Sequence, residues 1–335
     1  MRLVSYLHPD APQRPKLGGI VDEAIVDLDA AATWAQGACS LSREDLPSNM
    51  LEFIYAGEAT WQYARCVLDE VIKAGNPLNL RGAKHKPVAS SRSSVHLLPP
   101  IHPLTLRDAY AFEQHVKKAN ENRGREIPEE WYQFPVFYYT NPNAVFGPDE
   151  VIPPPRYTRA LDYELEIAAI IGKPGKDLDK DSAASTIFGF TVLNDWSARD
   201  IQRAEMKAGL GPAKGKDFAS SLGPCILTVD ELSDRATERP GVYDLSMTAR
   251  INGTERSRGN FKEIYWSFGE ILSHVSDEIQ IYPGEVVGSG TVGTGCLLEL
   301  TKGEGPWLLS GDVVELEIER IGILRNIIGA SKKQS

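Results

Sequence analysis

From about residue 95 onward, the sequence is dominated by short apolar runs that are typical of β-strands. Turn-forming stretches such as Asn141-Pro-Asn and Pro153-Pro-Pro separate these runs. We expect strands over 134–139, 161–171, 188–193, 226–229, 246–251, 297–300 and 313–318, interrupted by helices over 110–121, 197–207 and 262–274. The pattern predicts a β-rich α+β fold.

The first ninety residues have a different pattern. Strands are expected over 3–7 and 19–27, and a helix over 58–74 carries its apolar residues at spacings of three and four. A Lys-, Pro- and Ser-rich stretch over 84–94 is typical of a linker. A chain of 335 residues has room for about two domains. We therefore predict a small N-terminal domain with its linker over 1–95 and a larger domain over 96–330.

The net charge of the protein limits the kinds of partner that it is expected to bind. The 36 Lys and Arg residues against 46 Asp and Glu residues give a net charge of −10. Nucleic acids and anionic membranes are bound through clusters of basic residues, so neither is an expected partner. The sequence starts without the apolar segment of a secretory signal, and no apolar run approaches membrane-spanning length. We therefore expect a cytoplasmic protein.

Several familiar catalytic motifs are absent or incomplete. Gly288-Ser-Gly290-Thr-Val-Gly293 matches the dinucleotide-binding pattern in its letters, but a strand-like run follows where a helix is required. We expect this loop to be a glycine-lined backbone surface that can approach a small anionic ligand. The sequence contains neither Gly-x-Ser-x-Gly nor His-Glu-x-x-His, and its four cysteines form no Cys-x-x-Cys pair.

Carboxylates are concentrated in the expected strand over 161–171. Because side chains alternate along a strand, Asp162, Glu164 and Glu166 would share one face. That face is either solvated or, inside a cleft, neutralised by a cation. Asp195 follows the expected strand over 188–193 and is either a further ligand or the N-cap of the next helix. Carboxylates without Cys or His ligands favour Mg²⁺, Mn²⁺ or Ca²⁺ over zinc.

A histidine lies near another carboxylate. Asp108 and His115 are seven residues apart, which in a helix corresponds to two turns and therefore to one face. A single histidine in this position is more often structural than catalytic.

Taken together, the motifs resemble the fumarylacetoacetate hydrolase family over about 97–325, and the first ninety residues resemble its smaller N-terminal domain more loosely. The resemblance implies a β-roll catalytic domain and a homodimer. Five ordered motifs carry it: Asp108-Ala-Tyr110 with His115; Tyr163-Glu164-Leu-Glu166; Asn194-Asp195-Trp-Ser-Ala-Arg199-Asp-Ile-Gln202; Gly215-Lys216-Asp-Phe-Ala-Ser220; and Gly288-Ser-Gly-Thr291 followed by Glu299.

The resemblance also implies roles for individual residues. A metal ion would be bound by Asp108, Glu164, Glu166 and Asp195. His115 would be the general base, Glu299 would orient it, and Lys216 would lie near the developing oxyanion. Substrate would contact Tyr110, Arg123, Gln202 and Thr291. Met206 stands where fumarylacetoacetate enzymes place a substrate-contacting tyrosine.

The expected activity is metal-dependent hydrolysis of a carbon–carbon bond in a small-molecule 1,3-diketo acid, such as an acylpyruvate or a fumarylacetoacetate-like compound. His115 would activate water, and the divalent cation, Mg²⁺ in the first place, would stabilise the enolate. An enzyme of this kind would serve aromatic catabolism. The alternative is a 2-oxo acid decarboxylase or isomerase, for example an oxaloacetate decarboxylase, that uses the same metal site. A third hypothesis is a non-catalytic, metal-stabilised binding module.

Overall fold

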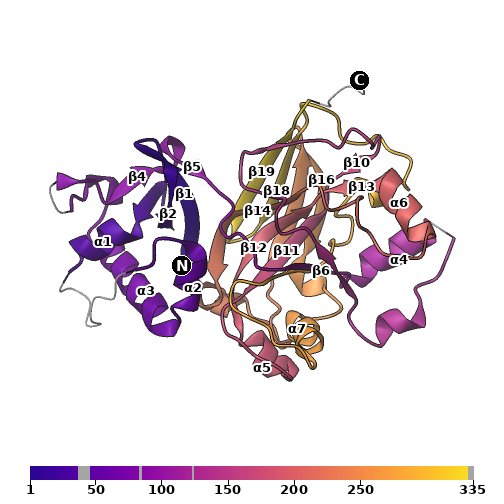
Figure 1. Ribbon diagram of the computed structural model, residues 1–335, viewed down its shortest axis with the longest axis horizontal. Helices are drawn as coiled ribbons and strands as arrows, with labels where there is room; N and C mark the ends of the chain where they lie inside the picture. Colours follow the sequence, from indigo (N-terminus) through magenta and orange to yellow (C-terminus); the bar gives the residue numbers. More distant parts are fainter. Residues whose placement is uncertain (37–45, 83–84, 123, 331–335) are drawn as a thin grey trace.

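The computed structural model describes residues 1–36, 46–82, 85–122 and 124–330, arranged in a smaller N-terminal lobe and a larger β-rich lobe (Figure 1). Within these residues, no helix combines the length and the apolar composition that crossing a membrane requires. The predicted division of domains at residue 95 stays a prediction.

The smaller lobe packs helices on the first strands. It contains β1 (Arg2–His8), β2 (Ala11–Val21), β3 (Ala24–Asp27), α1 (Leu28–Trp34), α2 (Met50–Tyr55), α3 (Glu58–Lys73) and β4 (Ala89–Ser91). The predicted helix is confirmed as α3, which buries Ala64, Val67 and Val71. The single strand expected over 19–27 is instead the end of β2 and all of β3, because the chain turns at Asp22, whose φ is 51°.

One large sheet joins both lobes. Its main path is β4-β3-β2-β1-β14-β12-β11-β17-β6-β7, and β1 pairs with β14 in an antiparallel ladder. The strands outside the smaller lobe are β5 (His96–Leu97), β6 (Leu106–Ala109), β7 (Phe137–Thr140), β8 (Val145–Phe146), β11 (Leu165–Ile171), β12 (Ile187–Asp195), β14 (Ser220–Thr228) and β17 (Val286–Gly288).

A second sheet covers one face of the large one. It has the order β16-β15-β18-β19-β9 and consists of β9 (Val151–Ile152), β15 (Ser246–Ile251), β16 (Thr254–Asn260), β18 (Val313–Ile318) and β19 (Gly322–Ile328). Along β11, Ile167 and Ala169 belong to the core shared with this sheet, whereas Ala168 and Ile170 belong to the core shared with the smaller lobe. Because both faces of the central strands are buried, these strands are continuous apolar runs. The fold is β-rich and mixed α/β, as predicted.

The remaining elements surround the sheets. They are β10 (Leu161–Asp162), β13 (Ser197–Ala198), α4 (Glu113–Glu121), α5 (Lys180–Ala184), α6 (Arg199–Lys207), α7 (Phe268–Ser276) and α8 (Leu297–Leu300). The strands predicted over 246–251 and 313–318 and the helix predicted over 197–207 are confirmed, the helix starting two residues later.

Three predictions about secondary structure are wrong in ways that affect the site. Residues 297–300 form the short helix α8 instead of a strand, and its first amides donate to the carboxylate of Asp162. The strand over 161–171 is broken into β10 and β11. Asp108 and His115 do not share a helix, because Asp108 pairs with Gly288 and Tyr138 in the large sheet and α4 begins only at Glu113.

Gly288 allows the central strands to approach the carboxylates. In β17 it lies opposite Ala168 of β11 and Asp108 of β6. A Cβ atom at this position would lie 2.4 Å from Asp108 Oδ1 and 2.6 Å from Leu193 Cδ2. Both neighbours are buried, so an added methyl group would have to displace side chains that are already packed.

We expect Gly288→Ala to lower the free energy of unfolding by about 1–3 kcal/mol, because the methyl group overpacks a buried site. Chemical denaturation measures this. Gly82→Ala is the matched control, since its Cβ would meet its nearest neighbour at 3.6 Å. Equal unfolding midpoints for Gly288→Ala and the wild type would contradict the close packing described here.

Candidate active site

Four carboxylates converge at one place in the large sheet. Asp108 lies on β6, Glu164 directly precedes β11, Glu166 lies on β11, and Asp195 ends β12. One oxygen of each can be chosen so that all lie within 4.8 Å of one another, and all four residues are buried. The convergence follows from the strand order β12-β11-β17-β6, with Gly288 of β17 making room in the middle. The alternative that Asp195 caps a helix is wrong, because the N-cap of α6 is Ala198.

The electrostatics of this cluster fit a hard divalent cation. Burial, reinforced by the charge of Asp195, raises the pKa of Asp108 to about 7. Burial and the charge of Asp108 raise the pKa of Glu166 well above its usual range. Glu166 Oε2 and Asp195 Oδ1 are buried without a hydrogen-bond partner in the described part of the chain. Buried oxygens of this kind are costly unless a cation binds them.

Two basic side chains neutralise part of the cluster. Lys216 Nζ contacts Glu164 and lies 2.5 Å from Asp195 Oδ2, and Arg199 Nη1 lies 2.8 Å from Glu164 Oε1. Burial opposes the ionisation of Glu164, but the charges of Lys216 and Arg199 outweigh it and hold its pKa well below the usual range. Lys216 therefore lies among the carboxylates, and its predicted role beside an oxyanion stays a prediction.

Asp162 is not part of the cluster. It was predicted to share a face with Glu164 and Glu166, but the break between β10 and β11 removes the alternation on which that prediction depends. Its carboxylate accepts hydrogen bonds from Arg199 Nε at 2.8 Å and from the backbone amides of Leu297 and Leu298. Asp162 therefore anchors Arg199 and the start of α8.

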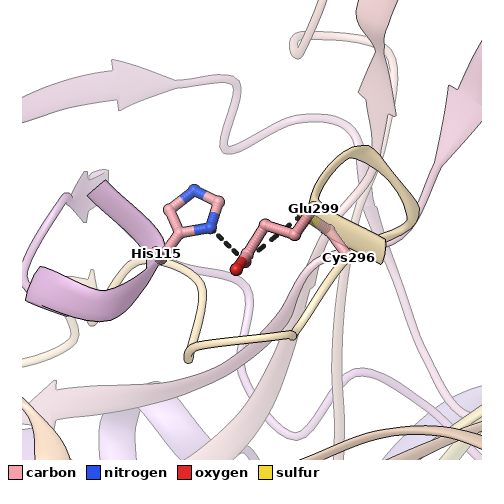
Figure 2. A group of neighbouring side chains, drawn as sticks. All are labelled: His115, Cys296 and Glu299. Atoms are coloured by element: carbon pink, nitrogen blue, oxygen red, sulfur yellow. Dashed lines mark hydrogen bonds and ion pairs between the residues drawn. The ribbon is translucent and has the colours of Figure 1, made fainter. Parts of the chain in front are cut away.

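His115 and Glu299 form a buried pair that links α4 to α8. His115 Nδ1 lies 2.5 Å from Glu299 Oε1, and Figure 2 shows the other ring nitrogen directed away from the carboxylate. Glu299 is itself held by the backbone amide of Thr294 at 3.0 Å and lies 3.7 Å from Cys296 Sγ. A carboxylate fixed in this way orients the imidazole.

A cavity of about 290 Å³ opens beside these groups. Eight of the eleven predicted site residues line it: Asp108, Tyr110, His115, Glu164, Glu166, Gln202, Lys216 and Thr291. Asp195 contacts Lys216 and Glu299 contacts His115, and both of these partners line the cavity. Arg123 lies outside the described residues. The roles assigned to these residues stay predictions, but ten of the eleven gather around one cavity.

The prediction from sequence missed several residues that shape this site. Tyr138 lines the cavity, and its hydroxyl donates to Asp195 Oδ2. Gly290 N donates to Asp108 Oδ1 at 3.1 Å, so this amide of the glycine loop binds a carboxylate of the chain itself rather than a ligand. At Gly290 φ is 77°, a conformation that favours glycine. The sequence predicts a strand over 134–139, which contains Tyr138, but it does not show which strand pairs with it.

The site can be compared with known proteins. Residues 105–328 match the model of the family described as "Fumarylacetoacetate (FAA) hydrolase C-terminal". The chain is 28% identical to a fumarylacetoacetase of Arabidopsis thaliana, over 90% of this chain and 84% of that one. It is 30% identical to the mitochondrial oxaloacetate tautomerase FAHD2A of Homo sapiens, over 84% of this chain and 80% of the relative.

A solved structure shares the whole architecture. The maleylpyruvate hydrolase of Sphingobium sp. SYK-6, in complex with manganese(II) and pyruvate, superposes with a TM-score of 0.66 at 20% identity, covering 99% of this chain and 100% of that one. The family match spans well over half of the chain and includes every predicted site residue. The chain therefore belongs to the fumarylacetoacetate hydrolase family.

Proposed function

We propose that this protein is a metal-dependent hydrolase that cleaves a carbon–carbon bond in a 1,3-diketo acid such as an acylpyruvate. The observation that carries the proposal is the His115–Glu299 pair beside the four carboxylates on one cavity. A water-activating base and a cation site side by side are what such a hydrolysis needs. Relatives named as a fumarylacetoacetase and a maleylpyruvate hydrolase support the substrate class.

The protein's own residues supply the proton transfer. Glu299 accepts the Nδ1–H of His115, which leaves Nε2 unprotonated in the neutral imidazole. Nε2 takes a proton from water, and the resulting hydroxide adds to the distal carbonyl carbon of the substrate. When the carbon–carbon bond breaks, its electron pair goes to the leaving carbon and is delocalised onto the neighbouring carbonyl. The imidazolium then returns the proton to that carbon.

Charge on the leaving fragment needs stabilisation. We propose that Asp108, Glu164, Glu166 and Asp195 hold a divalent cation, Mg²⁺ in the first place, which supplies Lewis-acid stabilisation of negative charge on substrate oxygens. The manganese ion in the maleylpyruvate hydrolase supports the cation class. Lys216 and Arg199 add fixed positive charge at Glu164.

A lyase or isomerase remains the alternative activity. It is favoured by the relative named oxaloacetate tautomerase and by the same acidic cluster, because an enolate can form at such a site without water adding to the substrate. Product analysis across acylpyruvates, fumarylacetoacetate and oxaloacetate separates the two. Two fragments, each bearing a ketone or carboxylate, indicate hydrolysis, whereas carbon dioxide or a changed tautomer indicates the alternative. Binding without turnover would favour a non-catalytic module.

We expect His115→Ala to lower kcat for diketo acid hydrolysis by about 10²- to 10⁴-fold, because the base that activates water is lost. Mn²⁺ affinity, measured by calorimetry, should stay within about twofold, since His115 is outside the carboxylate cluster. His102→Ala, a change at an exposed histidine, is the control. Unchanged kcat in His115→Ala would remove this residue from the mechanism.

Divalent cations should control both activity and stability. A chelator should abolish turnover, Mg²⁺ or Mn²⁺ should restore it, and the cation should raise Tm because it binds only the folded chain.

Glu166→Gln should weaken Mn²⁺ binding at least about tenfold, since a charged ligand is replaced by a neutral one. Glu129→Gln, an exposed position outside the site, is the control. Equal Mn²⁺ affinities for the two variants would exclude the carboxylate cluster as the metal site.

A further inference from the structure

A second cavity lies at the mouth of the first. This outer cavity has a volume of about 540 Å³ and shares Ala119, Arg199, Gln202, Met206 and Leu298 with the cavity that holds the carboxylates. It lies between α4 and α6, which are neighbours at the edge of the larger lobe (Figure 1). Because five residues line both spaces, the two form one continuous cleft.

The outer cavity is basic although the protein is acidic. Its lining includes Arg125, Arg203, Lys207 and Lys302, with Glu304 as its acidic residue, while the whole chain has a net charge of −10. All four basic side chains are exposed. None of them forms an ion pair or a side-chain hydrogen bond that the structure records among its described residues.

Some basic residues elsewhere are neutralised by the protein itself. Half-buried Arg250 pairs with Glu317 at 2.7 Å, and exposed Lys262 pairs with Asp244 at 2.8 Å. A concentration of basic side chains without carboxylate partners in a cleft gives a positive local potential, which attracts anions. The rim of the outer cavity is therefore suited to bind a carboxylate group of a ligand.

Helix α6 connects the outer cavity to the carboxylate cluster. Arg199, Arg203 and Lys207 recur every four residues, so they lie along one side of the helix. Arg199 is buried and contacts Glu164, whereas Lys207 is exposed at the other end. A rise of 1.5 Å per residue separates these two positions by about 12 Å along the helix axis. The basic rim therefore begins well outside the inner cavity.

The passage between the two ends is partly apolar. Met206, Leu298 and Ala119 line both cavities. A ligand that fills the whole cleft would thus meet polar groups at its inner end, apolar side chains beside Arg199 and Gln202 in the middle, and positive charge at its outer end. An extended chain with an anionic group at its far end matches this sequence of environments.

We propose that Arg203, Lys207 and Lys302, with Arg125, bind a second carboxylate at the far end of an extended dicarboxylic substrate. The inference rests on the proposed function, and it narrows the substrate class to diketo acids whose acyl chain ends in a carboxylate. Oxaloacetate is too compact, because its two carboxylates are too close to reach from the inner cavity to this rim.

The test compares two substrates that share the same acyl chain. One is an acylpyruvate whose acyl chain ends in a carboxylate, and the other is the methyl ester of that terminal group. The ratio of their kcat/KM values isolates the terminal charge, since the reacting end is the same. The double variant Arg203→Gln/Lys302→Gln removes two of the four cations. Arg14→Gln/Lys86→Gln changes the net charge equally at exposed positions away from both cavities and is the matched control.

In the wild type, we expect the dicarboxylate to be preferred at least about tenfold at low ionic strength. The Arg203→Gln/Lys302→Gln variant should lower this ratio about fivefold or more, whereas the control variant should leave it unchanged. Salt should lower the ratio in the wild type, because exposed cations are screened. A wild-type ratio near one, or equal ratios in the two double variants, would overturn the proposal.

Failure of the proposed function would give a different result. If the wild type hydrolyses neither substrate, the hydrolase assignment fails. Calorimetric titration of the same two compounds, in the presence of Mg²⁺, then tests the basic rim alone. Tighter binding of the dicarboxylate that is lost in Arg203→Gln/Lys302→Gln supports the rim, and equal affinities of both compounds for the wild type overturn it.

Discussion

Burying four carboxylates at one point of a sheet is the constraint on which the rest of this structure depends. Like charges within a few ångströms of one another in a low-dielectric interior repel strongly, and desolvation adds to the cost. The chain offsets part of that cost with Lys216 and Arg199, and with the amide of Gly290, which donates to Asp108. Two buried oxygens, Glu166 Oε2 and Asp195 Oδ1, have no hydrogen-bond partner among the described residues. Their desolvation cost is therefore not offset by these groups.

The two-sided burial of the central strands explains how such a costly arrangement is held in place. Glu164 and Asp195 lie at one end of the β11–β12 ladder, where Leu165 pairs with Asn194. The apolar remainder of both strands packs on the second sheet on one face and on the core of the smaller lobe on the other. Strands fixed on both faces cannot shift to separate the carboxylates, so the packing sets the geometry of the site.

The elements predicted correctly are those whose pattern is local. Burial alternates along the strand over 313–318, the strand over 246–251 has a buried centre, and α6 follows its own helical pattern. The errors arise where contacts with residues far away in the sequence determine the secondary structure. Residues near Asp108 form a strand because β17 and β7 pair with them, and α8 exists where Asp162 binds its amides. The neighbours of Tyr138 and Gly288 depend on strand register, which one sequence does not specify.

The charges along the cleft link the two proposals physically. Its floor carries four carboxylates against the cations Lys216 and Arg199, and its rim carries Arg125, Arg203, Lys207 and Lys302. Because burial raises the pKa of Asp108 and of Glu166, the floor without a cation has little net charge to attract the anionic end of a diketo acid, whereas a bound divalent cation attracts that end. The rim stays positive in either case. A dicarboxylate would therefore be attracted at its outer end by the rim alone, while its reacting end becomes attracted only once the carboxylates hold a cation.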